Sequence, residues 1–341
     1  MTPIRPVLEV EGLRVTYRQR RPRPWQRPRS VHAVDGVSFH IGSGETLGLV
    51  GESGCGKSSV GRAVLRLTEP SAGRVMLEGE DITSLPPWAL RRRRGRMQII
   101  FQDPSSALDP RMTVEELLSE PLLIAGWPRP RIHKRVREVL EIVSLLPEHL
   151  VRYPHEFSGG QKQRIGIARA LALEPRLLVC DEPVSALDVS VQAQIVNLMR
   201  EIQQKLGLSY LFIAHDLGVV RQISHRVAVM YLGQIVESGT RAQVYGAPLH
   251  PYTRALLAAA PRIRPPGEDA ARSPPLRGEL PDPANPPSGC RFRTRCPIAI
   301  PLCAEHAPET RDLGTGHLVA CHRAEQAGPA MAAHPAALTA G

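Results

Sequence analysis

A glycine-rich loop between an apolar run and a helix-like segment places the strictest limit on how this chain can fold. The loop, Gly51-Glu-Ser-Gly54-Cys-Gly56-Lys57-Ser58, matches the spacing G-x-x-x-x-G-K-[ST]. Its glycines let backbone N–H groups turn inward around an anion, and the start of the next helix adds partial positive charge. In such loops the lysine reaches the β- and γ-phosphates of a nucleotide, and the following hydroxyl ligates Mg²⁺. Because the 341 residues include only four lysines, a chance match is rare, and we predict that the chain binds a nucleoside triphosphate.

An apolar run that ends in two carboxylates supplies the second half of such a site. The run is Leu177-Leu-Val-Cys-Asp181-Glu182. At the tip of a buried strand Asp181 can hold Mg²⁺ through water, and Glu182 is placed to accept a proton from an attacking water molecule. Without the glycine-rich loop, an exposed acidic pair ending a strand would be the simpler interpretation. With the loop present, we predict that Asp181 is a metal ligand and that Glu182 is the catalytic base.

The apolar patterns predict an α/β fold around these two segments. Residues 7–17 and 31–41 alternate apolar and polar side chains, which is typical of half-exposed antiparallel strands. Other runs predict buried strands, separated by helices as in parallel strand–helix–strand units, and a hairpin. The expected strands are 46–50, 177–180, 210–214 and the hairpin 227–231 with 234–237, and the expected helices are 60–67 and 191–206. Residues from about 103 to 174 are mostly helical in pattern, with breaks expected at Pro121, Pro128, Pro130 and Pro154.

The C-terminal quarter of the chain has a different composition. Nine of the 27 residues from Pro261 to Pro287 are proline, which predicts a linker over about 256–287. A cysteine-containing segment is expected at 288–323 and an alanine-rich, disordered tail at 324–341. Residues 1–255 would then form one nucleotide-binding domain, interrupted by an Arg- and Pro-rich insertion at 18–30 of unassigned role.

Charge and hydropathy limit the surroundings in which the chain can act. The formal net charge is +10, but nearly all of the positive charge is arginine spread along the chain, so nucleic-acid binding is not expected. No apolar run approaches the roughly 20 residues of a membrane-spanning helix, and Met1 to Arg14 lacks the features of a signal peptide. We therefore expect a cytoplasmic chain whose membrane role, if it has one, comes through partners.

Four of the six cysteines cluster near the C-terminus, at Cys290, Cys296, Cys303 and Cys321. In a chain expected to be cytosolic, such a cluster favours a metal site over disulfides. Four thiolates on an irregular segment suit either Zn²⁺ or an iron–sulfur cluster, and free thiols in a loose tail are the remaining alternative.

A second glycine-containing segment carries a family resemblance. Phe157-Ser158-Gly159-Gly160-Gln161 precedes a helical pattern and resembles the signature sequence of the ABC ATPases, with Phe where Leu is commoner. A helix start with two glycines is a second anion site. The resemblance implies a P-loop NTPase (RecA-like) core with an antiparallel β subdomain, a helical subdomain and a small cysteine-containing C-terminal extension. It also implies a head-to-tail dimer, in which the signature of one subunit meets the ATP held by the phosphate loop of the other.

Further residues match the family's motifs in the family's order. Gln102 resembles the glutamine that touches Mg²⁺ and the attacking water, Asp188 the loop at the dimer interface, and His215 the histidine that contacts the γ-phosphate. Tyr17 resembles the aromatic residue that stacks on adenine, with Trp25 as a rival. The residues implied to bind ATP are Tyr17, Gly51, Glu52, Ser53, Gly54, Cys55, Gly56, Lys57, Ser58 and Ser59, with Mg²⁺ held by Ser58, Gln102 and Asp181.

Segments outside the catalytic motifs resemble the ATPases of the oligopeptide/dipeptide/nickel importers, most of all the second (F-type) ATPase of oligopeptide systems. They include Arg152-Tyr-Pro-His-Glu-Phe157, Leu249-His-Pro-Tyr-Thr-Arg254 and Asn285-Pro-Pro-Ser-Gly-Cys290. This resemblance implies an ATPase at the cytoplasmic face of the cell membrane, and a [4Fe–4S] cluster on the four cysteines. The implied partners are two permease subunits, a second ATPase (a non-identical sister or another copy of this chain) and, indirectly, a peptide-binding protein. Nickel or another small solute as cargo, and a soluble ABC-type ATPase acting on nucleic acid, are the alternatives.

Overall fold

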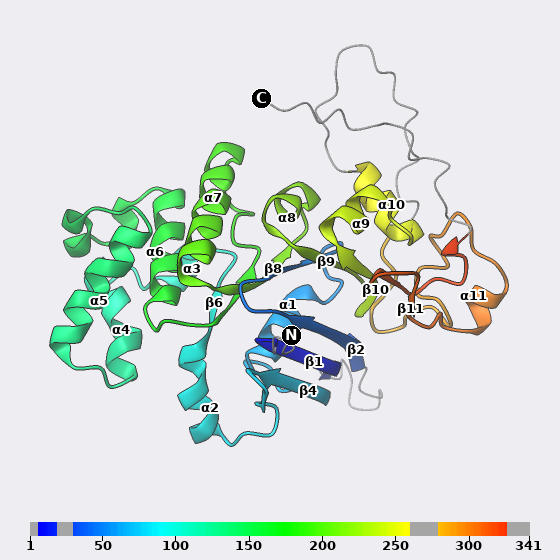
Figure 1. Ribbon diagram of the computed structural model, residues 1–341, viewed down its shortest axis with the longest axis horizontal. Helices are drawn as coiled ribbons and strands as arrows, with labels where there is room; N and C mark the ends of the chain where they lie inside the picture. The colour runs from blue at the N-terminus through cyan, green and yellow to red at the C-terminus, as the bar shows by residue number, and fades with distance from the viewer. Residues whose placement is uncertain (1–5, 19–29, 260–278, 326–341) are drawn as a thin grey trace, which may run out of the picture.

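The computed structural model describes residues 6–18, 30–259 and 279–325. Trp25, most of the Arg- and Pro-rich insertion, most of the proline-rich linker and the tail from residue 326 lie outside these ranges. Two sheets, a helical arm and a C-terminal segment make up the described part (Figure 1).

The larger sheet has eight strands in the order β11-β12-β10-β9-β3-β8-β7-β6, of which β11 (Arg311–Asp312) and β12 (Leu318–Val319) come from the C-terminal segment. Its centre is parallel, since β3 pairs in parallel with both β8 and β9, and β7 with both β6 and β8. The central strands are β3 (Thr46–Val50), β6 (Met97–Ile100), β7 (Leu177–Asp181), β8 (Ser209–Ala214) and β9 (Arg226–Tyr231), followed by β10 (Gln234–Thr240). Every residue of β3, β7 and β8 is buried, because both faces of a parallel sheet are covered by other elements. The predicted strand–helix–strand unit and the hairpin of β9 and β10 are confirmed.

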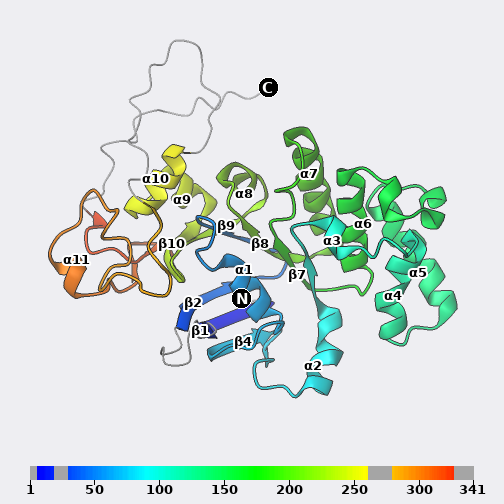
Figure 2. The same ribbon diagram turned by 180° about the vertical axis from the view of Figure 1, so that it is seen from behind.

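The smaller sheet is antiparallel, with the strand order β2-β1-β4-β5. Its members are β1 (Leu8–Arg18), β2 (Ser30–Ile41), β4 (Ala72–Leu77) and β5 (Glu80–Asp81). Helix α1 (Lys57–Val64) packs between the two sheets, as the view from behind shows (Figure 2). Along β7, Leu177 and Val179 face this inner core, whereas Leu178 and Cys180 face the core on the other side. Alternate residues of β7 therefore face opposite sides of the large sheet. Helix α1 and the loop before it lie on the side that faces the small sheet, at the centre of the molecule.

The segment from 103 to 174 forms a helical arm at one end of the molecule (Figure 1). Its helices are α3 (Pro104–Ala107), α4 (Val114–Ile124), α5 (Arg129–Ile142) and α6 (Gly159–Leu171), with short 3₁₀ turns η2 (Pro147–Val151) and η3 (Pro154–Glu156). The expected break at Pro121 is wrong, because this proline lies inside α4. The Ala125 N–H still bonds to the Pro121 carbonyl at 3.1 Å, and burial of Val114, Leu117, Leu118 and Leu122 outweighs the lost hydrogen bond. Pro128, Pro130 and Pro154 stand at helix starts, as a proline at a boundary should.

The remaining helices cover the large sheet or connect it to the other parts. They are α2 (Pro87–Arg93), which leads through the turn η1 (Arg94–Arg96) into β6, and α7 (Val189–Leu206), α8 (Leu217–Ile223), α9 (Arg241–Gly246) and α10 (Pro251–Ala259). Within the described residues, no helix combines the length and apolar character needed to cross a membrane. Because α10 continues to Ala259, the proline-rich connection begins later than the expected position 256.

The cysteine-containing segment is joined to the main sheet. It holds α11 (Leu302–Glu305), β11 (Arg311–Asp312) and β12 (Leu318–Val319). Strand β12 pairs antiparallel with β10 and extends the large sheet by two strands. Ala324, assigned to the tail from the sequence, is fully buried. Through β11 and β12, the cysteine-containing segment thus shares a continuous sheet with the rest of the described chain.

Candidate active site

The glycine-rich loop lies between β3 and α1, at the edge where the parallel strands end. It opens onto a cavity of about 470 Å³. The lining residues are Ala33, Ser53, Gly54, Gly56, Lys57, Ser58, Ser59, Gln102, Glu182 and His215. All of these except Ala33 are residues that the sequence had singled out, so the separated motifs are brought to one place.

The loop has the conformation of an anion cradle that only glycine permits at its last turn. Gly56 has φ +108°, and a Cβ on it would lie 2.0 Å from the Ala33 carbonyl oxygen. Lys57 begins α1 and is only 4% exposed. Its Nζ donates to the carbonyl oxygens of Gly51 at 2.8 Å and Glu52 at 2.9 Å. The buried ammonium is therefore held inside the loop, where it can bind a phosphate oxygen.

The two halves of the predicted metal site meet across the sheet. The Ser58 hydroxyl donates to Asp181 Oδ1 at 2.8 Å. Burial raises the pKa of Asp181, while the Ser58 hydrogen bond and the nearby Arg62 guanidinium oppose that rise. A hydroxyl and a carboxylate with only oxygen donors match the preference of Mg²⁺, which takes few protein ligands and completes its shell with water and phosphate. The donor set thus fits the predicted ion.

Three polar side chains from neighbouring strand ends converge on one carboxylate oxygen. Gln102 follows β6, Glu182 follows β7 and His215 follows β8. Gln102 Nε2 donates to Glu182 Oε2 at 3.2 Å, and His215 Nδ1 lies 3.1 Å from the same oxygen. Because these strands are parallel and adjacent, their carboxyl ends share one edge of the sheet, where α/β folds place their sites.

Glu182 is held in an unusual backbone conformation. Its φ of +48° lies in the left-handed region, which costs of order 1–3 kcal/mol for a residue with a side chain. The Glu182 N–H bonds to the Ile213 carbonyl at 2.9 Å and fixes this turn. Its side chain is 14% exposed, so the carboxylate faces the cavity from a largely enclosed position. Such outliers gather at functional sites.

The predicted adenine-stacking residue lies at the edge of the loop. The Tyr17 hydroxyl donates to Ser59 Oγ at 3.3 Å, and the side chain is 39% exposed. An exposed aromatic ring beside the phosphate loop is free to accept a flat ligand on its face. The rival candidate, Trp25, lies outside the described residues.

The signature segment is folded as a capped helix start away from this cavity. The Ser158 side chain accepts from the Gln161 N–H, and the Gln161 side chain accepts from the Ser158 N–H, which forms a capping box at the start of α6. Asp188 is the N-cap residue of α7, without a side-chain capping hydrogen bond. Among the described residues that line the cavity there is no signature residue and no Asp188. The predicted signature segment is therefore a capped helix start that is separate from the cavity of its own chain.

Two residues with no site role assigned from the sequence hold the start of the loop. Arg295 donates to both carboxylate oxygens of Glu52, at 2.6 and 3.0 Å, and the Tyr252 hydroxyl accepts from the Glu52 N–H at 2.8 Å. They come from the cysteine-containing segment and from α10. Contacts at such sequence separation leave no local signal, so only the fold could reveal them.

The four clustered cysteines are free thiols. Burial raises the pKa of the Cys290 thiol to about 11, and the charges of Cys303, Cys296 and Cys321 add to the rise. The four thus lie near one another, and as donors they suit zinc or an iron–sulfur cluster. Yet the part of the chain that the structure describes holds no group of three or more His, Cys, Asp or Glu arranged to bind a metal. The predicted [4Fe–4S] cluster is not supported by this arrangement.

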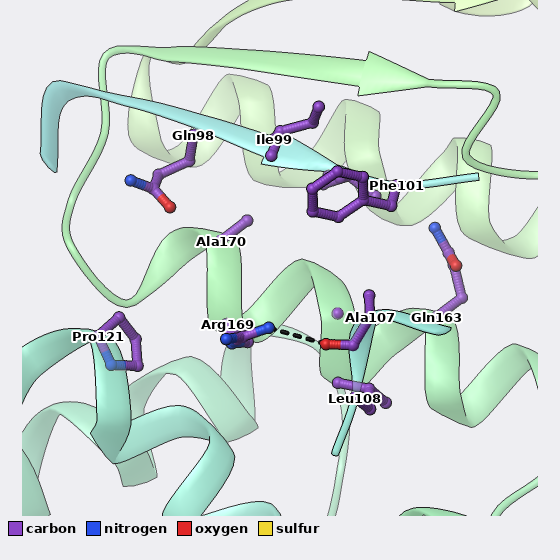
Figure 3. A pocket seen from close by; sticks show the side chains of 11 residues that line it. Gln98, Ile99, Phe101, Ala107, Leu108, Pro121, Gln163, Arg169 and Ala170 are labelled. Carbon is purple, nitrogen blue, oxygen red and sulfur yellow. Dashed lines mark hydrogen bonds between the residues drawn. The ribbon is translucent and has the colours of Figure 1, made fainter. Parts of the chain in front are cut away.

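A second cavity, of about 190 Å³, lies between the strand β6 and the helical arm (Figure 3). The Phe101 ring lines one side of the cavity, and Leu108 lies on the opposite side. Arg169 also lines this cavity and donates to the Ala107 carbonyl at 2.8 Å and to Glu120 at 2.7 Å. Gln163 is 1% exposed and its Nε2 has no hydrogen-bond partner among the described residues. Phe101, which lines this cavity, is followed in the chain by Gln102, which lines the first cavity.

Comparisons with known proteins agree with this geometry. The family model "ABC transporter" matches residues 34–185, and the model "Oligopeptide/dipeptide transporter, C-terminal region" matches residues 236–303. The oligopeptide transport ATP-binding protein AppF of Bacillus subtilis is 53% identical over 86% of this chain and 89% of its own. The oligopeptide transport ATP-binding protein OppF of Escherichia coli is 53% identical over 89% of this chain and 92% of its own.

Solved structures show the same fold. CbiO1 from Clostridium perfringens, part of an ABC transporter complex, is 28% identical with a TM-score of 0.62 over 71% of this chain and 91% of its own. A dimeric ATP-binding cassette solved with ADP and Pi is 26% identical with a TM-score of 0.60 over 69% of this chain and 98% of its own. The phosphate loop, the converging strand ends and a relationship that spans nearly the whole chain together show that it belongs to the ABC transporter family, as an ATP-binding protein of the oligopeptide/dipeptide group.

Proposed function

We propose that this chain is the ATP-hydrolysing subunit that powers an ABC importer of peptides. The observation that carries the proposal is the convergence of Gln102, Glu182 and His215 on the cavity lined by the phosphate loop. The cargo class comes from the relatives, which are named for oligopeptide transport and are 53% identical over 86% and 89% of this chain. The family model of the oligopeptide/dipeptide transporter C-terminal region, which matches residues 236–303, agrees with it. The formal net charge of +10 mildly favours a nucleic-acid-directed ATPase, but the match of residues 236–303 to the oligopeptide/dipeptide transporter model favours the importer.

Each side chain in the cavity has a distinct role in this proposal. Lys57 binds the terminal phosphates, as the backbone N–H groups of the loop do. Glu182 accepts the proton of the attacking water, and its enclosed carboxylate is held for this purpose by Gln102 and His215. His215 also reaches the γ-phosphate, and Tyr17 stacks on the adenine.

Mg²⁺ is the cofactor that this donor set fits, held by Ser58, by Asp181 through water and by Gln102. When bound, the ion neutralises charge on the β- and γ-phosphates. The chain's own contribution is the fixed geometry: Ser58 and Asp181 already meet at 2.8 Å, so the two ligands come from elements held together by the fold.

The site requires a second chain to be complete. Ser158, Gly159, Gly160 and Gln161 present a capped helix start, which is a preformed anion site, but they lie outside this chain's own ATP cavity. In the proposed dimer they contact the γ-phosphate of the ATP held by the partner ATPase, and Asp188 lies at the interface. Binding of ATP then closes the pair and hydrolysis reopens it.

The second cavity is the proposed contact with the permease (Figure 3). Its volume of about 190 Å³ suits an apolar side chain from a short permease helix. The apolar rim formed by Phe101 and Leu108 would cover that side chain, and the Gln163 amide would donate to a backbone carbonyl of the same helix. A movement of the permease helix in this cavity is transmitted through Gln102 to the Glu182 carboxylate. Closure of the ATPase pair and movement of the permease are therefore linked.

Uptake of a labelled tripeptide tests the cargo and the engine together. Cells whose only copy of this gene carries Lys57→Ala should lose tripeptide uptake, while cells with the exposed substitution Lys205→Ala should keep it. If the Lys57→Ala cells retained tripeptide uptake and lost nickel uptake instead, this ATPase would be assigned to nickel import. Retention of the purified chain on DNA or RNA, with no permease association in detergent, would favour the soluble ATPase.

The cysteine segment carries a separate proposal, that it binds a [4Fe–4S] cluster after a local rearrangement of the four thiols. Their shared position, not their present arrangement, supports it. Protein purified without oxygen should be brown and hold about four iron atoms per chain. Colourless protein with one zinc per chain would assign the thiols to zinc, and protein free of both metals would leave them as free cysteines.

A further inference from the structure

A buried ion pair connects the C-terminal segment to the first turn of the phosphate loop. Arg295 Nη1 and Nη2 bind Glu52 Oε2 and Oε1 at 2.6 and 3.0 Å, across 243 positions of sequence. The Arg295 side chain is 5% exposed and that of Glu52 is 28% exposed. Two parallel charged hydrogen bonds in a largely enclosed position define both the place and the orientation of the carboxylate.

The Arg295–Glu52 ion pair lies beside a cluster of three buried aromatic side chains. Tyr231, Tyr252 and Phe292 contact one another with ring centroids 4.7 to 5.4 Å apart, and all three are fully buried. A second anchor lies four residues before Arg295, where Arg291 pairs with Asp35 and donates to the Leu232 carbonyl. The C-terminal segment is thus fixed to the core at Arg291 and at Arg295, on either side of Phe292 in the sequence, and it can hold Arg295 in place.

Glu52 is bound at each of its polar groups. Its N–H donates to the Tyr252 hydroxyl, its carbonyl accepts from Lys57 Nζ at 2.9 Å, and its carboxylate accepts from Arg295. The Glu52 carbonyl is therefore one of the two carbonyl oxygens, with that of Gly51, that position the Lys57 ammonium. An unpaired carboxylate on this loop would also repel the triphosphate, because like charges repel each other more strongly in an enclosed site than in water.

We propose that Arg295 is a positioning residue of the ATP site, which holds Glu52 in the loop and neutralises its charge beside the triphosphate. The C-terminal segment then sets the nucleotide affinity of the phosphate loop, in addition to any function of its cysteines. The inference needs only the family's ATP binding and is independent of the peptide cargo.

The test is the dissociation constant of ATP, measured by displacement of a fluorescent ATP analogue from the full-length chain. Arg295→Ala should raise it about tenfold, since the loss of hydrogen bonds to a charged group commonly has at least this effect. Arg295→Lys restores the charge without the two-pronged geometry and should recover most of the affinity. Arg293→Ala is the matched control, because the Arg293 side chain binds Ser288 of its own segment, and its value should equal that of the unmodified chain.

The route through Glu52 is tested in a Glu52→Gln background. There Arg295→Ala should change the dissociation constant less than twofold, because no carboxylate is left to hold or neutralise. For hydrolysis, Arg295→Ala should raise KM for ATP and leave kcat close to that of the unmodified protein, whereas general damage to the fold would lower kcat.

Two results would overturn the proposal. One is an ATP affinity of Arg295→Ala equal to that of Arg293→Ala; the other is an effect of the same size in the unmodified background and in the Glu52→Gln background. If Arg295→Ala does not fold, Arg295→Gln, which also removes the charge but keeps a long polar side chain, gives the same comparison in the two backgrounds.

Discussion

Replacing the proposed catalytic base, Glu182, with glutamine is the substitution that most cleanly separates ATP binding from hydrolysis. Glutamine has the size of glutamate, so it can occupy the same turn and keep one acceptor for Gln102 or His215. It cannot take a proton from water. We therefore expect ATP to bind Glu182→Gln with an affinity within about threefold of the unmodified chain, because the contacts of Lys57 with the loop are untouched.

The size of the effect on hydrolysis follows from the geometry of this carboxylate. Glu182 Oε2 lies 3.2 Å from Gln102 Nε2 and 3.1 Å from His215 Nδ1, so two polar groups orient the same oxygen toward the cavity. A positioned general base contributes about 10²- to 10⁴-fold to a rate, which corresponds to about 3–5 kcal/mol of activation free energy. We expect kcat to fall by that range with little change in ATP affinity.

Phosphate release under saturating Mg²⁺-ATP measures kcat, and equilibrium binding of ATP measures affinity on the same preparation. Glu201→Gln on the exposed side of α7 is the matched control, because it makes the same chemical change away from the cavity. Turnover of Glu182→Gln within about twofold of the control would refute the assignment of Glu182 as the base.

The other predictions concern the phosphate loop and acid stability. Lys57→Ala should raise the dissociation constant of ATP at least ~30-fold, because a buried charge partner of the phosphates is lost; unchanged binding would contradict the cradle. Gly56→Ala should lower the free energy of unfolding by at least about 2 kcal/mol and abolish ATP binding, since its Cβ would lie 2.0 Å from the Ala33 carbonyl; thermal unfolding checks this. Burial lowers the pKa of His250 from 6.5 to about 4, against the opposing charge of Glu237. Between pH 6.5 and 4, His250 is protonated in the unfolded chain but not in the folded chain. The free energy of unfolding therefore falls as the pH falls through this interval, by about 3 kcal/mol in total. Urea unfolding at pH 7 and 4.5 should show most of this loss in the unmodified chain and a smaller one in His250→Asn, and equal losses would contradict it.

The parts of the site that could be predicted are those whose signal is local. The phosphate loop needs glycine, lysine and a hydroxyl at fixed spacing, and the apolar strands before Glu182 and His215 are short continuous runs. Once the strands are known to be parallel and adjacent, their carboxyl ends must meet at one edge. Strand order thus explains why Gln102, Glu182 and His215 meet, but the roles of Gln102 and His215 came from the family resemblance. The strand before Gln102, β6, was not expected from the sequence.

The parts that escaped prediction depend on contacts between distant segments. Strand β12 has only two residues (Leu318–Val319), too few for a periodic signal, and it is fixed by pairing with β10. Pro121 is tolerated inside α4 because the buried face of that helix outweighs local preference. The pair of Arg295 and Glu52 joins two segments whose separate patterns indicate nothing about each other.

The central claim is that ATP lies between two chains, with the phosphate loop of one facing the signature helix of the other. The most direct measurement is the mass, by light scattering, of Glu182→Gln with Mg²⁺-ATP, alone and mixed with its partner ATPase. We predict an ATP-dependent dimer that Ser158→Arg abolishes, because the added side chain blocks the signature end of α6. A strict monomer that hydrolyses ATP at full rate and is insensitive to Ser158→Arg would contradict the account.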